Sequence, residues 1–390
     1  MTPKYNRVVI HYGEIGTKGK NREVFERKLL SNVSRVLRSE VKRVYRRYGR
    51  IVAELSGDED LERIKEKLRW VPGIEYFSFA RSVGLKMEEI EKVVVEILKV
   101  HSFTSFKINT KRSNKEFPLT SMEVNRRVGE TVIKILGKKV NVIRPDVMVW
   151  IEICEKEAFV YTEKNKGIGG LPTTTGGKLI SLLSGGIDSP VASFLMMKRG
   201  CKIIFTHFFN QTLVTKASLR KVEKIVKELT KVQLDSKLYL VPFSEIQKEI
   251  IKNVPSNYRM LIYRRFMMRI SNRIAEMEKA KGIVTGDSVG QVASQTLENL
   301  RCIYEVAKLP VFSPLVGMNK EEIVELAKRI GTYQLSILPY PDCCSFMISP
   351  HPKTKASLKK VIELENLIPE KERLIEHCLS RLETKTFSFP

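Results

Sequence analysis

The feature that most constrains the fold is a series of short apolar runs separated by helical stretches of ten residues or more. The runs KLISLL, KIIFTHFF, KLYLVPF and GIVTGD follow one another between residues 178 and 287. Continuous apolar strands joined by helices are typical of a parallel sheet that is buried on both faces. Ligands of such sheets bind outside the carboxyl ends of the strands. We therefore predict a doubly wound α/β domain over residues 177–390, with its site at that edge and a helical cap of two helices, separated at Pro369, at its end.

The first 165 residues have a different texture. A strand is expected over residues 5–12, helices over residues 22–37, 60–75, 87–100 and 118–136, and two strands in hairpin register within residues 141–163. This order indicates small α+β modules rather than a continuation of the parallel sheet. The segment 166–176 is rich in Gly, Thr and Pro, so we predict a linker there and the main domain boundary near residue 172.

Length and charge limit the number of domains and the classes of partner that this chain can have. A chain of 390 residues exceeds the usual size of one hydrophobic core, so two or three domains are expected. Residues 1–170 carry 35 basic and 23 acidic side chains and residues 171–390 carry 33 and 21, which gives each half a net charge of +12. A basic excess spread over every domain favours a large polyanion such as nucleic acid. Adaptation to heat, the alternative, predicts balanced signs.

The sequence gives no sign of a membrane anchor or of export. No apolar run approaches the roughly 20 residues of a membrane span, and MTPKYNRVVI lacks the features of a signal peptide. We therefore expect a cytoplasmic protein without a membrane partner, whose six Cys are thiols. Cys154, Cys201, Cys302 and Cys378 lie in apolar contexts and are expected in the core.

The sharpest chemical signal is KLISLLSGGIDSPVASFLMMKRG, in which an apolar strand ends at Leu183 and a helix begins near Pro190. Glycines in the intervening loop let backbone N–H groups approach an anion, and the helix dipole adds positive charge. Ser184 and Ser189 supply hydroxyls, and Asp188 supplies a carboxylate either to hold Mg²⁺ or to orient phosphates. The alternative is an ordinary strand-to-helix turn that contains two glycines. We predict a phosphate-binding loop.

Basic side chains surround tyrosines in the run KRVYRRYGR. Such a mixture suits base stacking and phosphate contacts on RNA, and a solvated basic edge strand is the alternative. The predicted RNA-binding residues in this and other basic segments are Lys18, Lys20, Arg22, Arg46, Arg47, Arg112, Arg126 and Arg127. The glycines of GEIGTKGK lack the spacing of a Walker A loop, so a turn is expected there.

The glycine-serine loop also carries a family resemblance. SGGIDSP resembles the SGGxDS loop of the ATP pyrophosphatase (PP-loop) superfamily, and the whole chain resembles its ThiI family, the tRNA 4-thiouridine synthetases. YGEIGTKGKNR is similar to the start of the family's ferredoxin-like domain, and FPLTSMEVNRRVGETV followed by RPD is similar to its RNA-binding THUMP domain. The resemblance implies a ferredoxin-like domain over residues 1–59, a THUMP domain over 60–165, the linker 166–176 and a PP-loop catalytic domain over 177–390.

The resemblance further implies ATP with Mg²⁺ as ligands. The implied nucleotide-binding residues are Leu182, Leu183, Ser184, Gly185, Gly186, Asp188, Ser189, His207, Phe208, Arg264, Gly286 and Gln295. Without the resemblance, His207 and Phe208 would be interpreted as a strand end with a hydrogen-bonded histidine. Lys320 matches a family lysine that assists activation, although by itself it is an ordinary residue at the start of a helix. No residue is assigned as a permanent metal ligand.

PYPDCCSFMISP contains two adjacent cysteines, which lack the CxxC spacing of a metal site. Adjacent cysteines often occur by chance. The second one matches the catalytic cysteine of the ThiI family, so the resemblance assigns Cys344 as the persulfide carrier, with Asp188 and Lys320 as further catalytic residues and Cys343 as a weaker candidate for a resolving thiol. An iron–sulfur cluster would need three or four suitably spaced thiolates, and the sequence offers no such set.

The resemblance implies an ATP-dependent tRNA sulfurtransferase that adenylates uridine 8 and replaces its 4-oxygen with sulfur. The implied partners are tRNA, a cysteine desulfurase and a second copy in a homodimer. Some family members have a C-terminal rhodanese domain that relays sulfur, and this chain ends before one could fit, which weakens a role in thiamine synthesis. Two other classes remain open: a PP-loop ligase or amidotransferase acting on a small molecule, and a non-catalytic RNA-binding protein.

Overall fold

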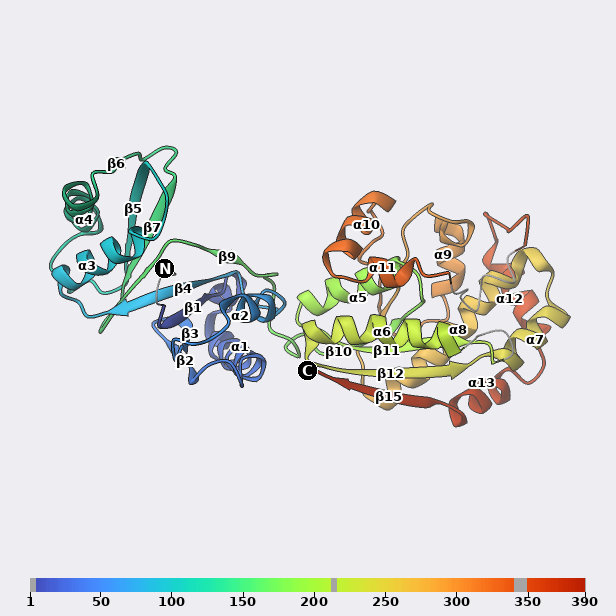
Figure 1. Cartoon of the computed structure of the whole chain (residues 1–390). Coiled ribbons are helices and arrows are strands. Elements are labelled where there is room, and N and C mark those ends of the chain that lie inside the picture. Colours follow the sequence, from blue (N-terminus) through green and yellow to red (C-terminus); the bar gives the residue numbers. More distant parts are fainter. Residues whose placement is uncertain (1–4, 212–215, 340–348, 390) are drawn as a thin grey trace. The chain divides into compact units, whose positions relative to one another are not determined.

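The chain forms two compact units, Met1–Pro172 and Thr173–Pro390 (Figure 1). The computed structural model describes residues 5–211, 216–339 and 349–389. Each unit is built around one sheet. Within the described ranges, no helix is both long enough and apolar enough to cross a membrane.

The first unit begins with a two-helix, four-stranded arrangement. Its elements are β1 (Arg7–His11), α1 (Arg22–Val36), β2 (Arg43–Arg47), β3 (Arg50–Glu54), α2 (Leu61–Leu68) and β4 (Tyr76–Val83). Strand β1 pairs antiparallel with both β3 and β4. Tyr48 and Gly49 join β2 to β3 with positive φ angles of 54° and 69°, as a tight hairpin turn requires. The ferredoxin-like domain was expected to end at residue 59. Helix α2 and strand β4 lie after that position but belong to the same arrangement, because β4 pairs with β1.

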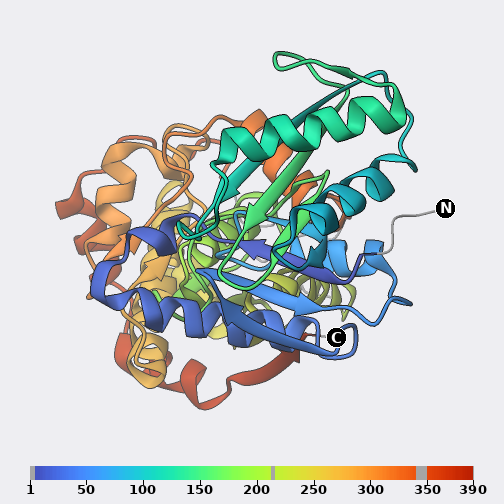
Figure 2. The same cartoon turned by 90° about the vertical axis from the view of Figure 1, so that its left-hand side faces the viewer.

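The same sheet continues into a second group of elements. They are α3 (Met87–Leu98), β5 (Ser105–Arg112), α4 (Ser121–Leu136), β6 (Lys139–Val140), β7 (Val147–Ile153), β8 (Ala158–Tyr161) and β9 (Asn165–Lys166). Thr120 and Glu123 form a capping box that starts α4, and Gly137 ends it in a left-handed conformation. Helices α3 and α4, teal in Figure 2, pack their apolar sides onto β5, β7 and β8.

Strand β4 joins the two groups, because its first half pairs with β1 and its second half pairs with β8. The result is one nine-stranded sheet in the order β2-β3-β1-β4-β8-β7-β5-β6, with β9 also pairing with β4. A buried carboxylate reinforces the junction. Glu152 of β7 lies 3.0 Å from His11 Nε2 of β1 and 2.5 Å from Arg50 Nε of β3, and it accepts a hydrogen bond from Tyr161.

In the described part of the second unit, six strands form one sheet in the order β14-β13-β10-β11-β12-β15. The first five are parallel: β10 (Lys178–Leu182), β11 (Lys202–Phe209), β12 (Asp235–Pro242), β13 (Ile283–Val284) and β14 (Val311–Phe312). The last strand, β15 (Glu383–Ser388), pairs antiparallel with β12. The expected C-terminal cap of two helices therefore exists but ends in an edge strand, which the sequence analysis missed.

Helices cover both faces of this sheet. Helices α5 (Asp188–Lys198) and α6 (Lys216–Gln233) lie along one side of the strands (Figure 1). The largest core packs the other side against α7 (Ser244–Asn253), α8 (Arg259–Glu278), α9 (Leu297–Tyr304), α12 (Leu358–Asn366) and α13 (Lys371–Ser380). Strand β10 leads to β11 on one side and pairs with β13 on the other, so the strand order reverses at its carboxyl end. Crevices for ligands form at such reversals.

Candidate functional site

The loop between β10 and α5 is closed by its own serines. Ser184 N donates to Ser189 Oγ at 2.9 Å, and Gly186 N donates to Ser184 Oγ at 3.2 Å. The carbonyl oxygen of Gly186 accepts a hydrogen bond from Ser336 Oγ, at the end of α11 (Tyr333–Ser336). The two predicted hydroxyls therefore fix the shape of the loop, which lies directly before the first turn of α5. Its position at the reversal in strand order is the one expected of a phosphate-binding loop.

Asp188 is held from two sides. Lys320 Nζ, at the start of α10 (Lys320–Arg329), lies 2.6 Å from Asp188 Oδ1, and Gln291 Nε2 donates to Asp188 Oδ2 at 2.9 Å. The structure thus brings together the two described residues that were predicted to be catalytic, although 132 positions separate them. A carboxylate and an ammonium beside a glycine loop can orient a phosphate chain and balance its charge.

A second group of polar side chains surrounds Asp287, which follows β13. Arg264 Nη2 of α8 lies 2.6 Å from Asp287 Oδ2, Gln295 Nε2 donates to Oδ1 at 3.0 Å, and Tyr304 donates to Oδ2. Burial by itself would raise the pKa of Asp287, but the Arg264 guanidinium and these hydrogen bonds lower it overall. Burial and the Asp287 charge raise the pKa of Tyr304 to about 12. Arg264 and Gln295, both predicted nucleotide ligands, are therefore fixed through one ionised carboxylate.

Gly286 lies where the loop after β13 touches the end of the glycine loop and the first turn of α5. A Cβ atom at this position would be 2.8 Å from Ser189 N and 3.0 Å from the carbonyl carbon of Asp188. Real Cβ atoms essentially never approach other atoms within 3.0 Å. Only glycine therefore lets the loop after β13 pack directly against the first turn of α5.

The remaining predicted nucleotide ligands at the strand ends are largely buried. Leu183 N donates to Thr206 O, and the Leu183 carbonyl oxygen accepts from His207 Nδ1 at 2.9 Å. Phe208 packs in the main core, edge-to-face with Phe243. Since neighbouring strand residues point to opposite faces, the side chains of His207 and Phe208 do not form a pair. A ligand contact at Phe208 would involve its backbone rather than its ring. Leu182, the last residue of β10, packs against the same core.

Cys343 and Cys344, the predicted sulfur-carrying pair, lie outside the described residues. The four cysteines that the structure describes are all buried, as predicted: Cys154, Cys201, Cys302 and Cys378. Burial raises the pKa of each of these thiols, that of Cys378 to about 12. These four side chains are therefore protonated thiols at neutral pH and poor nucleophiles.

Four of the predicted RNA-binding residues line one hollow of about 590 Å³ in the first unit. The lining consists of Gly19, Lys20, Arg22, Glu23, Glu26, Arg46, Arg47, Tyr48 and Gly49, with four basic and two acidic side chains. Glu26 lies 2.7 Å from Arg22 and 2.8 Å from Arg46. Its pKa, which burial alone would raise, is lowered by the surrounding hydrogen bonds and charges. The arginines are thus held in place around an open cavity large enough for a nucleotide.

Two other predicted RNA-binding residues are engaged within the protein. Arg112 Nη1 donates to two carbonyl oxygens in the loop before α4, each at 2.7 Å. Arg127 on α4 contacts Glu88 and Glu91 of α3, at 2.7 and 2.6 Å. Arg112 therefore holds this loop, and Arg127, whose side chain is 45% exposed, links α4 to α3 at the surface.

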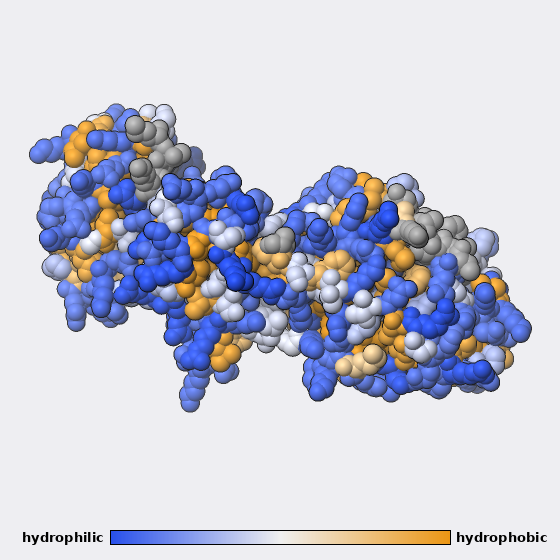
Figure 3. Space-filling model, turned by 60° about the horizontal axis from the view of Figure 1, so that its bottom comes forward, coloured by the Kyte–Doolittle hydropathy of each residue, from blue (hydrophilic) through white to orange (hydrophobic). Residues whose placement is uncertain are grey.

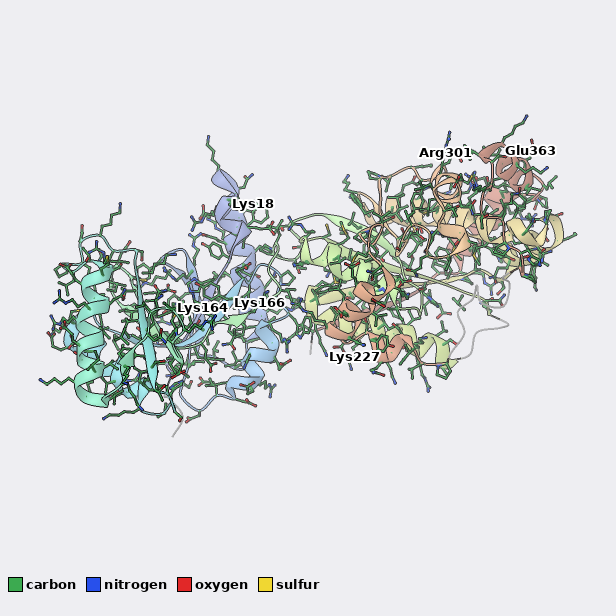
Figure 4. The ribbon with its side chains drawn as sticks, turned by 90° about the horizontal axis from the view of Figure 1, so that it is seen from above. Lys18, Lys164, Lys166, Lys227, Arg301 and Glu363 are labelled. Atoms are coloured by element: carbon green, nitrogen blue, oxygen red, sulfur yellow. The ribbon has the colours of Figure 1, made fainter. Side chains whose placement is uncertain are left out.

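Lys18 and Arg126 are less constrained. Lys18, labelled in Figure 4, has its ammonium 5.3 Å from the centre of the Phe25 ring. Arg126 is 83% exposed and lies 3.1 Å from Glu130. Such exposed ion pairs contribute little to stability, so Arg126 can exchange its partner for a phosphate.

Figure 3 shows that hydrophilic side chains cover most of the face it displays, with hydrophobic ones in small separate patches.

Known protein families match both units of the chain, and curated proteins match nearly its whole length. The ThiI ferredoxin-like domain matches residues 7–78, the THUMP domain matches residues 86–163, and the family described as thiamine biosynthesis protein (ThiI) matches residues 174–369. A probable tRNA sulfurtransferase of Thermoanaerobacter sp. (strain X514) is 44% identical over 92% of this chain and 94% of its own. The chain belongs to the ThiI family. A probable tRNA sulfurtransferase of Brevibacillus brevis is 41% identical over 97% of this chain and 96% of its own.

Solved structures show the same relationship. A 4-thiouridine synthetase in complex with RNA and with bound ATP matches this ThiI-family chain with a TM-score of 0.90 and 36% identity, over 98% of this chain and 100% of that one. A protein from Pyrococcus horikoshii matches with a TM-score of 0.66 and 26% identity, over 84% and 99%. The predicted fold, a PP-loop α/β domain preceded by ferredoxin-like and THUMP domains, is confirmed.

Three polar side chains of this ThiI-family chain make contacts or are buried in ways that the sequence analysis did not predict. Gln291 holds Asp188, but a glutamine in a loop gives no local signal. Lys164, labelled in Figure 4, lies 4.8 and 4.7 Å from the ring centres of Tyr76 and Trp150. Lys221 is buried in α6, and its signal was available: it occupies an apolar position four residues before Ile225.

Proposed function

We propose that this protein is an ATP-dependent tRNA sulfurtransferase, which adenylates uridine 8 of tRNA and replaces its 4-oxygen with sulfur to give 4-thiouridine. The observation that carries the proposal is the likeness, over nearly the whole chain, to a 4-thiouridine synthetase whose structure contains RNA and ATP. The two alternative functions each leave one part of the chain unexplained. A small-molecule ligase leaves the THUMP domain without a role, and a simple RNA-binding protein leaves the PP-loop site without one.

ATP is proposed to bind with its phosphates at the loop Ser184–Ser189. The close approach at Gly286 and the fixed positions of Arg264 and Gln295 supply a preformed wall beside that loop. Asp188 is the carboxylate that would hold Mg²⁺. Mg²⁺ is commonly bound by one or two carboxylates together with substrate phosphates and water, so a single carboxylate beside the loop suffices. When bound, the ion would neutralise charge on the leaving pyrophosphate.

The chemistry follows from the poor leaving group on carbon 4 of uridine. The 4-oxygen attacks the α-phosphate of ATP, an O–P bond forms, and pyrophosphate leaves. The loop amides and Lys320 stabilise the negative charge that develops there. The terminal sulfur of a Cys344 persulfide then attacks carbon 4 and displaces AMP. A second thiol must attack the remaining S–S bond, which releases 4-thiouridine and leaves a disulfide to be reduced; Cys343 is the candidate.

The first unit is proposed to bind the tRNA through the hollow around Lys20 and Arg47 and through the THUMP surface at Arg126. Counterion release from phosphates makes such binding depend steeply on salt. A cysteine desulfurase is the proposed sulfur donor, and a homodimer the proposed assembly.

The deciding experiment is nucleoside mass spectrometry of tRNA incubated with the protein, ATP, Mg²⁺, cysteine and a desulfurase. Wild-type protein should produce 4-thiouridine. Cys344→Ala should abolish the product yet retain pyrophosphate release, because adenylation precedes sulfur transfer. Asp188→Ala should abolish both and retain tRNA affinity. Full thiolation by Cys344→Ala would refute the assignment of the sulfur carrier, and no thiolation by the wild type would refute the function.

A further inference from the structure

A buried lysine lies beside the phosphate-binding loop. Lys221 in α6 is only 6% exposed, whereas Lys224 and Lys227 on the same helix are exposed. It shares the apolar face of α6 with Val222 and Ile225, which are also buried. Lysine is almost never fully buried without a reason, because removing an ammonium group from water costs several kcal/mol, of the order seen for buried ions.

The position of this side chain supplies the reason. A Cβ atom at Gly185 would lie 3.4 Å from Lys221 Cε and 3.6 Å from its Nζ, so the lysine stem crosses directly over the central glycine of the loop. Lys221 Nζ donates to the carbonyl oxygen of Leu338 at 3.1 Å. The ammonium is therefore fixed between the loop and Leu338, which directly follows α11, and α11 itself contacts the loop where Ser336 Oγ donates to the Gly186 carbonyl oxygen.

We propose that Lys221 is a phosphate-binding residue of this site, whose ammonium contacts the β- or γ-phosphate of ATP and the pyrophosphate that leaves. The inference rests on the proposed function, because it takes the loop to be the ATP site. Lys320 lies at the Asp188 side of the loop and Lys221 at the Gly185 side, so two cations flank the phosphate chain. A compact ammonium in a water-poor site is well suited to the concentrated charge of pyrophosphate.

This arrangement predicts a difference between nucleotides. A residue that contacts the β- or γ-phosphate stabilises bound ATP and bound pyrophosphate but not bound AMP. A residue that only supports the fold would weaken all three to the same extent, since each binds the same loop. The comparison of ATP with AMP therefore separates a ligand contact from a structural role.

The test compares Lys221→Met, Lys221→Arg and the control Lys227→Met in the full chain. Met keeps most of the buried stem without the charge, Arg keeps the charge, and Lys227, labelled in Figure 4, carries the same charge on the exposed side of α6. Dissociation constants for ATP, AMP and pyrophosphate are measured by calorimetry, together with thermal unfolding.

We expect Lys221→Met to weaken ATP and pyrophosphate binding at least about tenfold, as the loss of a charge-assisted hydrogen bond does, with less than about a twofold change for AMP. Lys221→Arg should keep most of the affinity, and Lys227→Met should match the wild type. Equal losses for ATP and AMP, or none, would overturn the role of Lys221 while wild-type ATP binding upheld the proposed site. A wild type that bound no ATP would instead overturn the proposed function, and the inference with it.

Discussion

Gly286→Ala tests how tightly the two loops of the candidate site are packed. The new methyl group would lie 2.8 Å from Ser189 N, about 0.6 Å closer than the 3.4 Å at which such contacts become ordinary. The obstructing atoms belong to the backbone of the first turn of α5, so no side chain can rotate away. Overpacking of this kind costs about 1–3 kcal/mol. Relief requires a shift either of the loop that carries residue 286 or of Ser184–Ser189, the proposed phosphate site.

The assay combines thermal unfolding with ATP affinity. If the strain is released by moving the loop, ATP affinity falls by about 5- to 150-fold, the equivalent of 1–3 kcal/mol. If the loop resists, the same strain lowers the unfolding free energy instead. Gly317→Ala is the matched control, because a Cβ atom there meets nothing within 4 Å and its φ is not positive. Wild-type stability together with wild-type ATP affinity in Gly286→Ala would refute the tight packing of the two loops.

Three other perturbations test separate parts of the molecule. In filter binding at several salt concentrations, Lys20→Gln should reduce the log–log slope by about 0.7–0.9, whereas Arg127→Gln, whose side chain braces α3 against α4, should not. Glu365→Ala should cost about 3–5 kcal/mol in chemical denaturation, because it leaves two arginines of α8 without their buried carboxylate. The pKa of Glu152, which burial alone would raise, is lowered to about 2, chiefly by His11. Its stabilisation is therefore complete above about pH 4.5 and is lost as the pH falls toward 2, so Glu152→Gln should flatten the acid limb of the unfolding curve. An unchanged acid limb in that variant would contradict the assignment.

The sequence predicted the features that depend on local chemistry. The apolar run ending at Leu183 and the glycines after it define both the strand and the loop, so the candidate site could be proposed without a structure. The buried cysteines were predicted for the same reason, since each lies in an apolar context. The bounds of α1 and α3 agree with the predicted helices to within two residues, because the helical spacing of their apolar residues can be recognised from neighbouring positions alone.

What escaped prediction depends on contacts between distant segments. Gln291 reaches Asp188 across 103 positions, and nothing in its own neighbourhood announces that bond. The internal partners of Arg112 and Arg127 also lie outside their local sequence, so those contacts could not be predicted from it, and the RNA-binding role of both residues stays a prediction. The strand β15 is a short polar alternation that pairs with the edge of β12 and contacts α6, so its formation depends on partners that lie far earlier in the chain.

The shared strand β4 fixes the distance between the two surfaces of the first unit that are proposed to bind RNA. The hollow at the β2–β3 turn and the outer surface of α4 are attached to one hydrogen-bonded plate, so the distance between them is set by strand spacing rather than by a tether. An RNA that touches both places must present phosphates at that separation. In the proposed complex, the spacing of phosphates along the RNA would therefore contribute to the choice of substrate.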